Sequence, residues 1–185
     1  PPLTELGERQ AAATGAALAD EPITAVYSSH LSRARRTGVA VAQTHGLEVT
    51  VMESLAEIHM FGDLKPNQRP LDVMTETELE GARRRFARER RWEVYPYTES
   101  SIDFRRRIGN ALEGIIAAHP AEMVVVACHG GVINAYVADF LKVEADMFFR
   151  PAHASIHRIL VRRERRVVQT LNELSHLRHD DLLTF

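Results

Sequence analysis

The amino-acid sequence predicts a three-layer α/β fold, in which helices cover both faces of a mostly parallel central sheet. Stretches with helical spacing of apolar residues alternate along the chain with short stretches of strand-forming residues, and this alternation is typical of parallel sheets. Residues 123–127 (MVVVA) form a continuous apolar run, which indicates a strand buried on both faces. The chain has 185 residues, of which 45% are hydrophobic. This length suits one domain, and we expect it to span residues 1–185.

Two helices and two strands are expected in the first half of the chain. Thr4 precedes the first helical stretch and is a suitable N-cap residue. Gly46 follows the second helical stretch and favours its termination. The expected elements are a helix over residues 5–20, a strand over 24–28, a helix over 32–44 and a strand over 48–52.

The second half begins with an irregular stretch over residues 54–74, which contains Gly62 and Pro70 and shows no clear period. After it, apolar residues return at helical spacing, and valine-rich runs separate the helical stretches. The tail over residues 175–185 is polar, and we expect it to be loosely held. The expected elements are helices over residues 75–92, 100–119 and 130–141 and strands over 123–127, 155–161 and 167–171.

The composition excludes several classes of protein. The formal net charge is −2, whereas dedicated nucleic-acid binders usually carry a basic excess. We therefore expect no nucleic-acid partner. No apolar run approaches the ~20 residues that cross a bilayer, so we expect no membrane span and no membrane partner. Cys128 is the single cysteine, which excludes an internal disulfide. With no visible export signal, these features predict a cytoplasmic protein.

Two strand ends carry residues suited to an anion. Arg33 lies in the first turn after the strand at 24–28, and His129 directly follows the strand at 123–127. Gly130 and Gly131 then open a helix, whose first backbone amides attract negative charge. Because ligands of open α/β sheets bind beyond the carboxyl ends of the strands, these groups together predict a phosphate or carboxylate site. A solvated surface arginine and a structural histidine at a turn are the alternatives at this point.

The residues around these strand ends also resemble a known family. In order along the chain, six segments between residues 3 and 160 are similar to motifs of the histidine phosphatase superfamily, which has the phosphoglycerate mutase-like fold. The segments are Leu3–Ala11 (LTELGERQA), Val26–Thr37 (VYSSHLSRARRT), Leu55–Gly62 (LAEIHMFG), Glu99–Arg107 (ESSIDFRRR), Val126–Ile133 (VACHGGVI) and Pro151–Ile156 (PAHASI).

The resemblance implies a specific chemistry. Members of the family attack a phosphate with a histidine, and arginines, a second histidine and backbone amides hold the phosphoryl oxygens. On the matching positions, Arg33 is a phosphate clamp, His129 stabilises the transferring phosphoryl group beside the Gly130 amide, and Glu57 is the general acid. The partner is then a small phosphorylated substrate, and neither a metal nor a cofactor is implied. Residues 60–97 lie at the position where members of the family differ in a cap over the substrate. A homodimer is a further expectation.

The sequence departs from the family at the nucleophile. The nucleophilic histidine belongs to an Arg-His-Gly motif on a strand before Leu3, and the chain contains no Arg-His-Gly. The family's first strand lies centrally in the sheet, so its absence would leave residues 123–127 without a neighbour and their backbone groups unpaired. Because the chain starts with two prolines and no methionine, we expect roughly 20–40 further residues upstream, which is a strand and a long loop.

These observations predict a phosphatase that hydrolyses small phosphate monoesters through a phosphohistidine. A phosphoglycerate mutase is the nearest alternative, although mutases need a longer insertion after the acid and residues 58–62 do not resemble theirs. A phosphate-binding regulatory protein without turnover is the other alternative, because fold alone does not establish function. A cysteine phosphatase is excluded, because it needs an arginine six positions after the cysteine and position 134 is Asn134.

Overall fold

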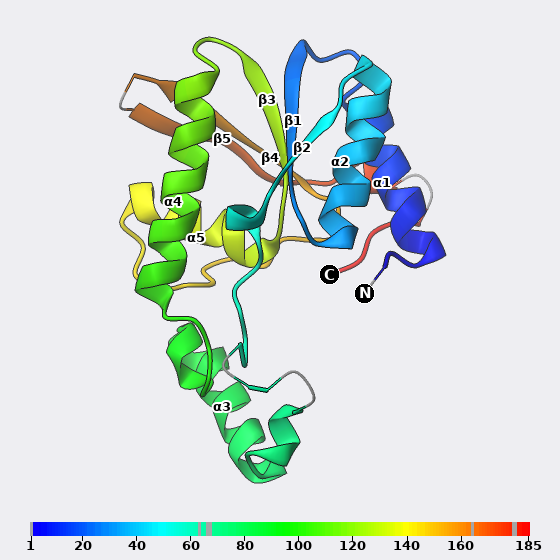
Figure 1. The fold of residues 1–185 in the computed structure, drawn as a ribbon. Coiled ribbons are helices and arrows are strands. Elements are labelled where there is room, and N and C mark those ends of the chain that lie inside the picture. Colours follow the sequence, from blue (N-terminus) through cyan, green and yellow to red (C-terminus); the bar gives the residue numbers. More distant parts are fainter. Residues whose placement is uncertain (1, 63, 66–67, 164, 179–180) are drawn as a thin grey trace.

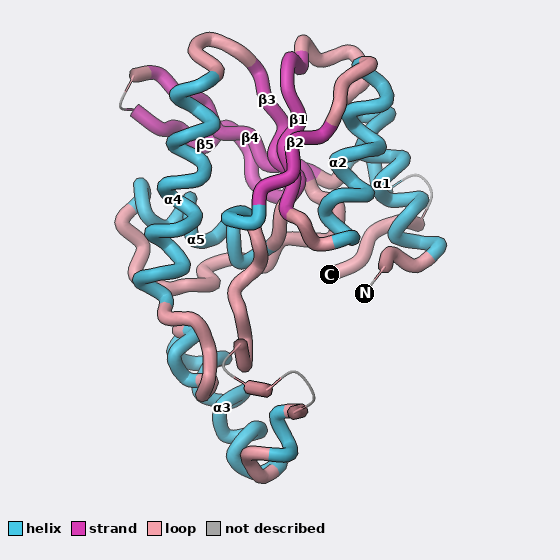
Figure 2. The backbone as a smooth tube through the Cα atoms, viewed as in Figure 1, coloured by secondary structure: helices cyan, strands magenta, loops and turns pink. Residues whose placement is uncertain are grey.

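The computed structural model describes residues 2–62, 64–65, 68–163, 165–178 and 181–185. At its centre lies a three-stranded sheet in the order β2-β1-β3, in which β1 pairs in parallel with both neighbours. Two further strands, β4 and β5, form an antiparallel ladder (Figure 2). The strands are β1 (Ile23–Ser29), β2 (Val49–Met52), β3 (Met123–Ala127), β4 (Ile156–Arg162) and β5 (Arg165–Glu173).

Helices cover the two faces of the parallel sheet, with α1 and α2 on one side and α4 and α5 on the other (Figure 1). Successive strand residues point to opposite faces. Accordingly, Val26 packs with Val41 of α2, whereas Tyr27 packs with Ile115 of α4. The α/β class predicted from the sequence is thereby confirmed. The helices are α1 (Glu5–Ala17), α2 (Ser32–His45), α3 (Glu76–Glu89), α4 (Ser101–Ala118), α5 (Gly130–Leu141) and α6 (Ser175–Arg178). None of the described helices is long and apolar enough to cross a membrane.

The helix ends follow the expected local chemistry. The Thr4 hydroxyl accepts a hydrogen bond from the Gly7 amide at 3.2 Å, which caps α1. Gly46 ends α2 in the left-handed region at φ 65°, where glycine carries no steric cost. Two helices end sooner than their sequence pattern predicts, α1 at Ala17 and α3 at Glu89.

Strand β3 is less buried than its sequence predicts. Val124, Val125 and Val126 are half-buried, and Met123 is 38% exposed. Within the described residues, β3 is hydrogen-bonded to β1 on one edge, and β4 belongs to a separate ladder. Val125 and Ile156 of β4 nevertheless pack against the same apolar cluster. Strands β3 and β4 therefore contribute to one core although they belong to separate ladders.

The expectation of a loosely held tail is wrong for the described residues 175–178 and 181–185. Leu177 and Leu182 are fully buried. The Gln10 side-chain amide of α1 donates hydrogen bonds to the Leu182 carbonyl at 2.6 Å and to the Thr184 hydroxyl at 2.8 Å. Two leucines in a polar run are a weak signal in the sequence, and their burial depends on contacts with the first helix of the chain.

The segment that carries α3 projects from the body of the molecule (Figure 1). One of its attachments is a buried carboxylate, Asp146, which is 3% exposed. Asp146 accepts hydrogen bonds from the Trp92 amide at 2.8 Å, the Ser101 hydroxyl at 2.5 Å and the Arg105 guanidinium at 3.0 Å. These bonds fix the C-terminal root of the segment to α4 and to the loop after α5, whereas α3 itself carries mostly exposed charged side chains.

Acid is expected to destabilise the protein through His157. Burial lowers the pKa of His157 to about 4, and the neutral ring accepts a hydrogen bond from the Asn172 amide at 3.3 Å. Between the ordinary histidine pKa and about 4, only the unfolded chain binds this proton, so stability falls as the pH falls through that window. The effect is on the order of 2 kcal/mol. Chemical denaturation at pH 7 and pH 4.5 measures it.

The comparison uses two variants. His157→Gln should lose less stability between pH 7 and pH 4.5 than the unmodified protein does. His153→Gln, at an exposed position, should keep the original pH dependence. An unchanged pH dependence in His157→Gln would contradict this prediction.

Candidate active site

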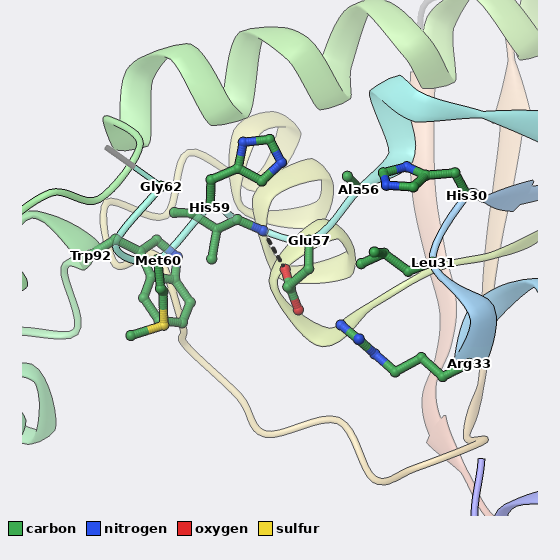
Figure 3. A pocket seen from close by; sticks show the side chains of 10 residues that line it. His30, Leu31, Arg33, Ala56, Glu57, His59, Met60, Gly62 and Trp92 are labelled. Atoms are coloured by element: carbon green, nitrogen blue, oxygen red, sulfur yellow. Dashed lines mark hydrogen bonds between the residues drawn. The ribbon is translucent and has the colours of Figure 1, made fainter. Parts of the chain in front are cut away.

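The site lies beyond the carboxyl ends of the three parallel strands. Arg33 is in the first turn of α2 after β1, Glu57 follows β2 and the short 3₁₀ turn η1 (Glu53–Leu55), and His129 is the N-cap residue of α5 after β3. Because parallel strands end at one edge of the sheet, this topology brings three distant segments together. The segments of Arg33 and Glu57 border a pocket of about 530 Å³ (Figure 3), and His129 lies outside its described lining. The pocket is lined by His30, Leu31, Arg33, Ala56, Glu57, Ile58, His59, Met60, Gly62 and Trp92.

The carboxylate of Glu57 lies against the first turn of α5. Its Oε1 accepts a hydrogen bond from the Ile58 amide at 3.0 Å, and its Oε2 accepts one from the Gly131 amide at 3.1 Å. The guanidinium of Arg33 points toward this carboxylate (Figure 3). Burial raises the pKa of Glu57, and the backbone hydrogen bonds and the positive Arg33 and Arg107 oppose this effect only in part. Glu57 is therefore a carboxyl group that retains its proton to higher pH than an ordinary glutamic acid.

His129 is held neutral in the same region. The residue is 6% exposed, and burial, assisted by the charges of Arg33 and His30, lowers the pKa of its imidazole to about 4. Among the described residues, the buried Nε2 atom has no hydrogen-bond partner. The Gly131 amide binds Glu57 two positions after His129, and Arg33 points toward the same carboxylate, so the three residues singled out by the sequence lie at the same end of the sheet.

The first turn of α5 is fixed by a residue to which the sequence assigned no role in the site. Asn134 is completely buried. Its side-chain nitrogen donates to the carbonyls of Gly130 and Phe149 at 2.9 and 3.1 Å, and its oxygen accepts from the Phe148 amide at 3.0 Å. These bonds orient the helix start that presents the Gly130 amide. A polar side chain one turn after a glycine pair is the only sequence signal of this role.

Three other side chains near the site also have clear positions. His30 is exposed and lines the pocket. Trp92 both packs the projecting segment, stacked on Phe86 with ring centroids 4.6 Å apart, and forms part of the pocket wall. Burial raises the pKa of Cys128 to about 12, so its sulfur is a neutral thiol and not a nucleophilic thiolate. Within the described residues, no three histidine, cysteine or acidic side chains group as metal ligands.

Replacing Gly131 by Ala is expected to displace the Glu57 carboxylate. A Cβ atom at position 131 would approach the Glu57 Cδ to 3.0 Å and Oε1 more closely still. Because the end of a glutamate side chain is flexible, the fold should tolerate this change. The general-acid role that the sequence resemblance implies for Glu57 predicts a proton transfer slower by roughly tenfold. Steady-state rates on an alkyl phosphate measure the effect. Gly109→Ala, at a helical glycine whose added Cβ meets nothing, is the control, and equal rates in both variants would contradict the prediction.

Comparison with known proteins finds related sequences and structures. A family model described as the histidine phosphatase superfamily (branch 1) matches residues 1–174. The chain is 31% identical over 183 residues to a protein named "Probable phosphoglycerate mutase GpmB" from Salmonella choleraesuis, covering 95% of this chain and 83% of that relative.

Solved structures give the same result for the fold. Bacillus stearothermophilus YhfR superposes with a TM-score of 0.81 at 24% identity, over 95% of this chain and 87% of that chain. A mycobacterial glucosyl-3-phosphoglycerate phosphatase superposes with a TM-score of 0.74 at 27% identity, over 92% and 87% of the two chains. The resemblance read from the sequence motifs is thereby confirmed.

Proposed function

Because the chain belongs to the histidine phosphatase superfamily, we propose that the protein hydrolyses small phosphate monoesters through a phosphohistidine intermediate. Names of phosphatases and of a mutase among its relatives support an enzyme. The observation that carries the proposal is the carboxyl group of Glu57, which has a raised pKa and lies beside the cationic Arg33. A proton donor next to a phosphate-binding cation is what hydrolysis of a monoester requires.

The described residues have distinct roles in this reaction. Arg33 offers a planar fork of donors to two phosphoryl oxygens. The neutral imidazole of His129 contributes Nε2, and the Gly130 amide contributes the positive end of α5. As the bond between phosphorus and the leaving oxygen breaks, Glu57 transfers its proton to that oxygen. The resulting carboxylate then takes a proton from the water that attacks the phosphohistidine, which releases phosphate and restores the acid.

The nucleophile is proposed to lie on a strand that precedes Leu3. Val125 of β3 and Ile156 of β4 pack against one apolar core, and the two strands belong to separate ladders. A strand between them would pair with β3, and its carboxyl end would lie beside His129. This arrangement supports an upstream histidine that attacks in line with the leaving group held near Glu57.

The mutase remains a second candidate, because a curated relative carries that name. A phosphate-binding protein without turnover is the third, because the chain contains no Arg-His-Gly motif. One set of assays on the full-length protein separates them. Hydrolysis of p-nitrophenyl phosphate and of an alkyl phosphate in the presence of EDTA supports the phosphatase. Isotope exchange between 2- and 3-phosphoglycerate supports the mutase, and phosphate binding without turnover of any ester supports the regulatory protein.

A further inference from the structure

Arg107 of α4 contacts the segment that carries Glu57 from behind. Its Nη1 donates hydrogen bonds to the carbonyls of Ser54 and Ala56 at 2.9 and 3.0 Å. These two carbonyls lie three positions and one position before Glu57. Its guanidinium also lies 5.0 Å from the centre of the Phe104 ring, which restricts its rotation. The backbone leading into Glu57 is therefore attached to a rigid side chain of a long helix.

Glu99 holds both Arg107 and the backbone on the other side of Glu57. Its carboxylate accepts from Nε and Nη2 of Arg107 at 3.0 and 2.7 Å, which is a bidentate ion pair. The same carboxylate accepts from the His59 amide at 3.3 Å, and the Glu99 amide donates to the His59 carbonyl at 3.0 Å. The ion pair thus fixes the chain before and after Glu57.

Neither member of this pair is available to the substrate. The four hydrogen bonds of Arg107 engage the donor nitrogens of its guanidinium in the pair with Glu99 and in the two backbone contacts. Neither Glu99 nor Arg107 is among the described residues that line the pocket. Both side chains are mostly buried, with 16% and 23% of their surfaces exposed. An ion pair of this kind is costly to break, because each partner alone would be a poorly solvated charge.

We propose that the Glu99–Arg107 pair is a positioning device, which holds the Glu57 carboxyl in the geometry required for proton transfer to the leaving group. The inference rests on the proposed function, because it assumes that Glu57 is the general acid. It assigns a specific task to two residues that do not touch the substrate. The rate of a step that needs a proton should depend on the pair, and the rate of a step that needs none should not.

The test compares leaving groups that differ in their need for a proton. Nitrophenolate departs without full protonation, whereas an alkoxide must receive a proton as it leaves. In the full-length protein, Arg107→Gln and Glu99→Gln should lower kcat/KM for an alkyl phosphate by roughly 10- to 100-fold, and for p-nitrophenyl phosphate by less than about threefold. Arg107→Lys keeps the positive charge and some of the hydrogen bonds of Arg107, so it should recover part of the lost kcat/KM for the alkyl phosphate. Retained activity on p-nitrophenyl phosphate also shows that each variant folds.

Two further variants complete the design. Arg106→Gln is the matched control, because Arg106 is the neighbouring residue on α4 and forms an exposed pair with Asp103; both rates should stay unchanged. Glu57→Gln should show the same dependence on the leaving group, and adding Arg107→Gln to it should cause little further loss, since both changes remove one proton transfer.

The possible failures are distinct. Equal losses on both substrates in Arg107→Gln and Glu99→Gln, or losses that add fully to that of Glu57→Gln, would overturn the positioning role while leaving the phosphatase intact. An unmodified protein that hydrolyses neither ester, or a Glu57→Gln variant in which kcat/KM falls equally for both esters, would overturn the proposed function and the positioning role with it.

Discussion

Replacing Arg33 by Ala is expected to lower kcat/KM for p-nitrophenyl phosphate by at least ~100-fold, which is the scale of one lost transition-state contact. Arg33 is a cationic side chain in the pocket wall, and its charge acts on both Glu57 and His129. Phosphoryl transfer depends mainly on positioning and on neutralising the charge of the equatorial oxygens. Lysine restores the charge without the planar fork, so Arg33→Lys should recover only a part of the rate.

The matched control for this prediction is Arg35→Ala. Arg35 lies on the same helix two positions later, is exposed, and does not border the pocket. Its replacement should leave kcat/KM unchanged, and thermal unfolding of both variants checks that the fold is retained. A near-normal rate in Arg33→Ala would refute its role as the phosphate clamp.

Replacing His129 by Ala is also expected to lower kcat/KM by at least ~100-fold. Its Nε2 atom is buried at the start of α5 and has no hydrogen-bond partner among the described residues. An unpaired buried polar atom is costly, and a bound phosphoryl oxygen would satisfy it. His45→Ala, at the far end of α2, is the control. Equal rates in the two variants would show that the phosphoryl group is held without this imidazole.

Titration of the His129 ring provides an independent measurement of the same geometry. The positive charge of Arg33 contributes to the lowering of the His129 pKa to about 4. Removal of that charge in Arg33→Ala should move the pKa upward, toward the ordinary histidine value. An NMR titration of the imidazole follows this shift without any turnover. A His129 pKa that is the same with and without Arg33 would show that the two side chains do not share one pocket.

The sequence predicted those parts of the fold that depend on local chemistry. The Thr4 cap and the Gly46 terminator act within a few residues, and the structure contains both. Arg33 and His129 were found because the end of a strand is visible in the sequence, and parallel strands bring their ends to one edge. Glu57 has no such local signal, and it was singled out through family resemblance.

The remaining features depend on contacts between distant segments. Asn134 donates a hydrogen bond to the Phe149 carbonyl, 15 positions away, and Arg107 donates one to the Ala56 carbonyl, 51 positions away. The spacing of apolar residues in the sequence does not predict such contacts. The burial of Leu182 depends in the same way on α1. The partial exposure of β3 depends on which strands lie beside it in the structure. The apolar run in the sequence indicates only that these residues favour burial.

The way in which the projecting segment is attached at its root has a consequence for protein engineering. Asp146 binds the Trp92 backbone and α4 together, while α3 contacts mainly its own neighbouring turns. Residues 76–89 can therefore be exchanged for a different helix that keeps an aromatic side chain at position 86, because Phe86 stacks on Trp92 of the pocket wall. Under the proposed function, we expect such an exchange to change the selectivity for the alcohol part of an ester while Arg33, Glu57 and His129 stay in place.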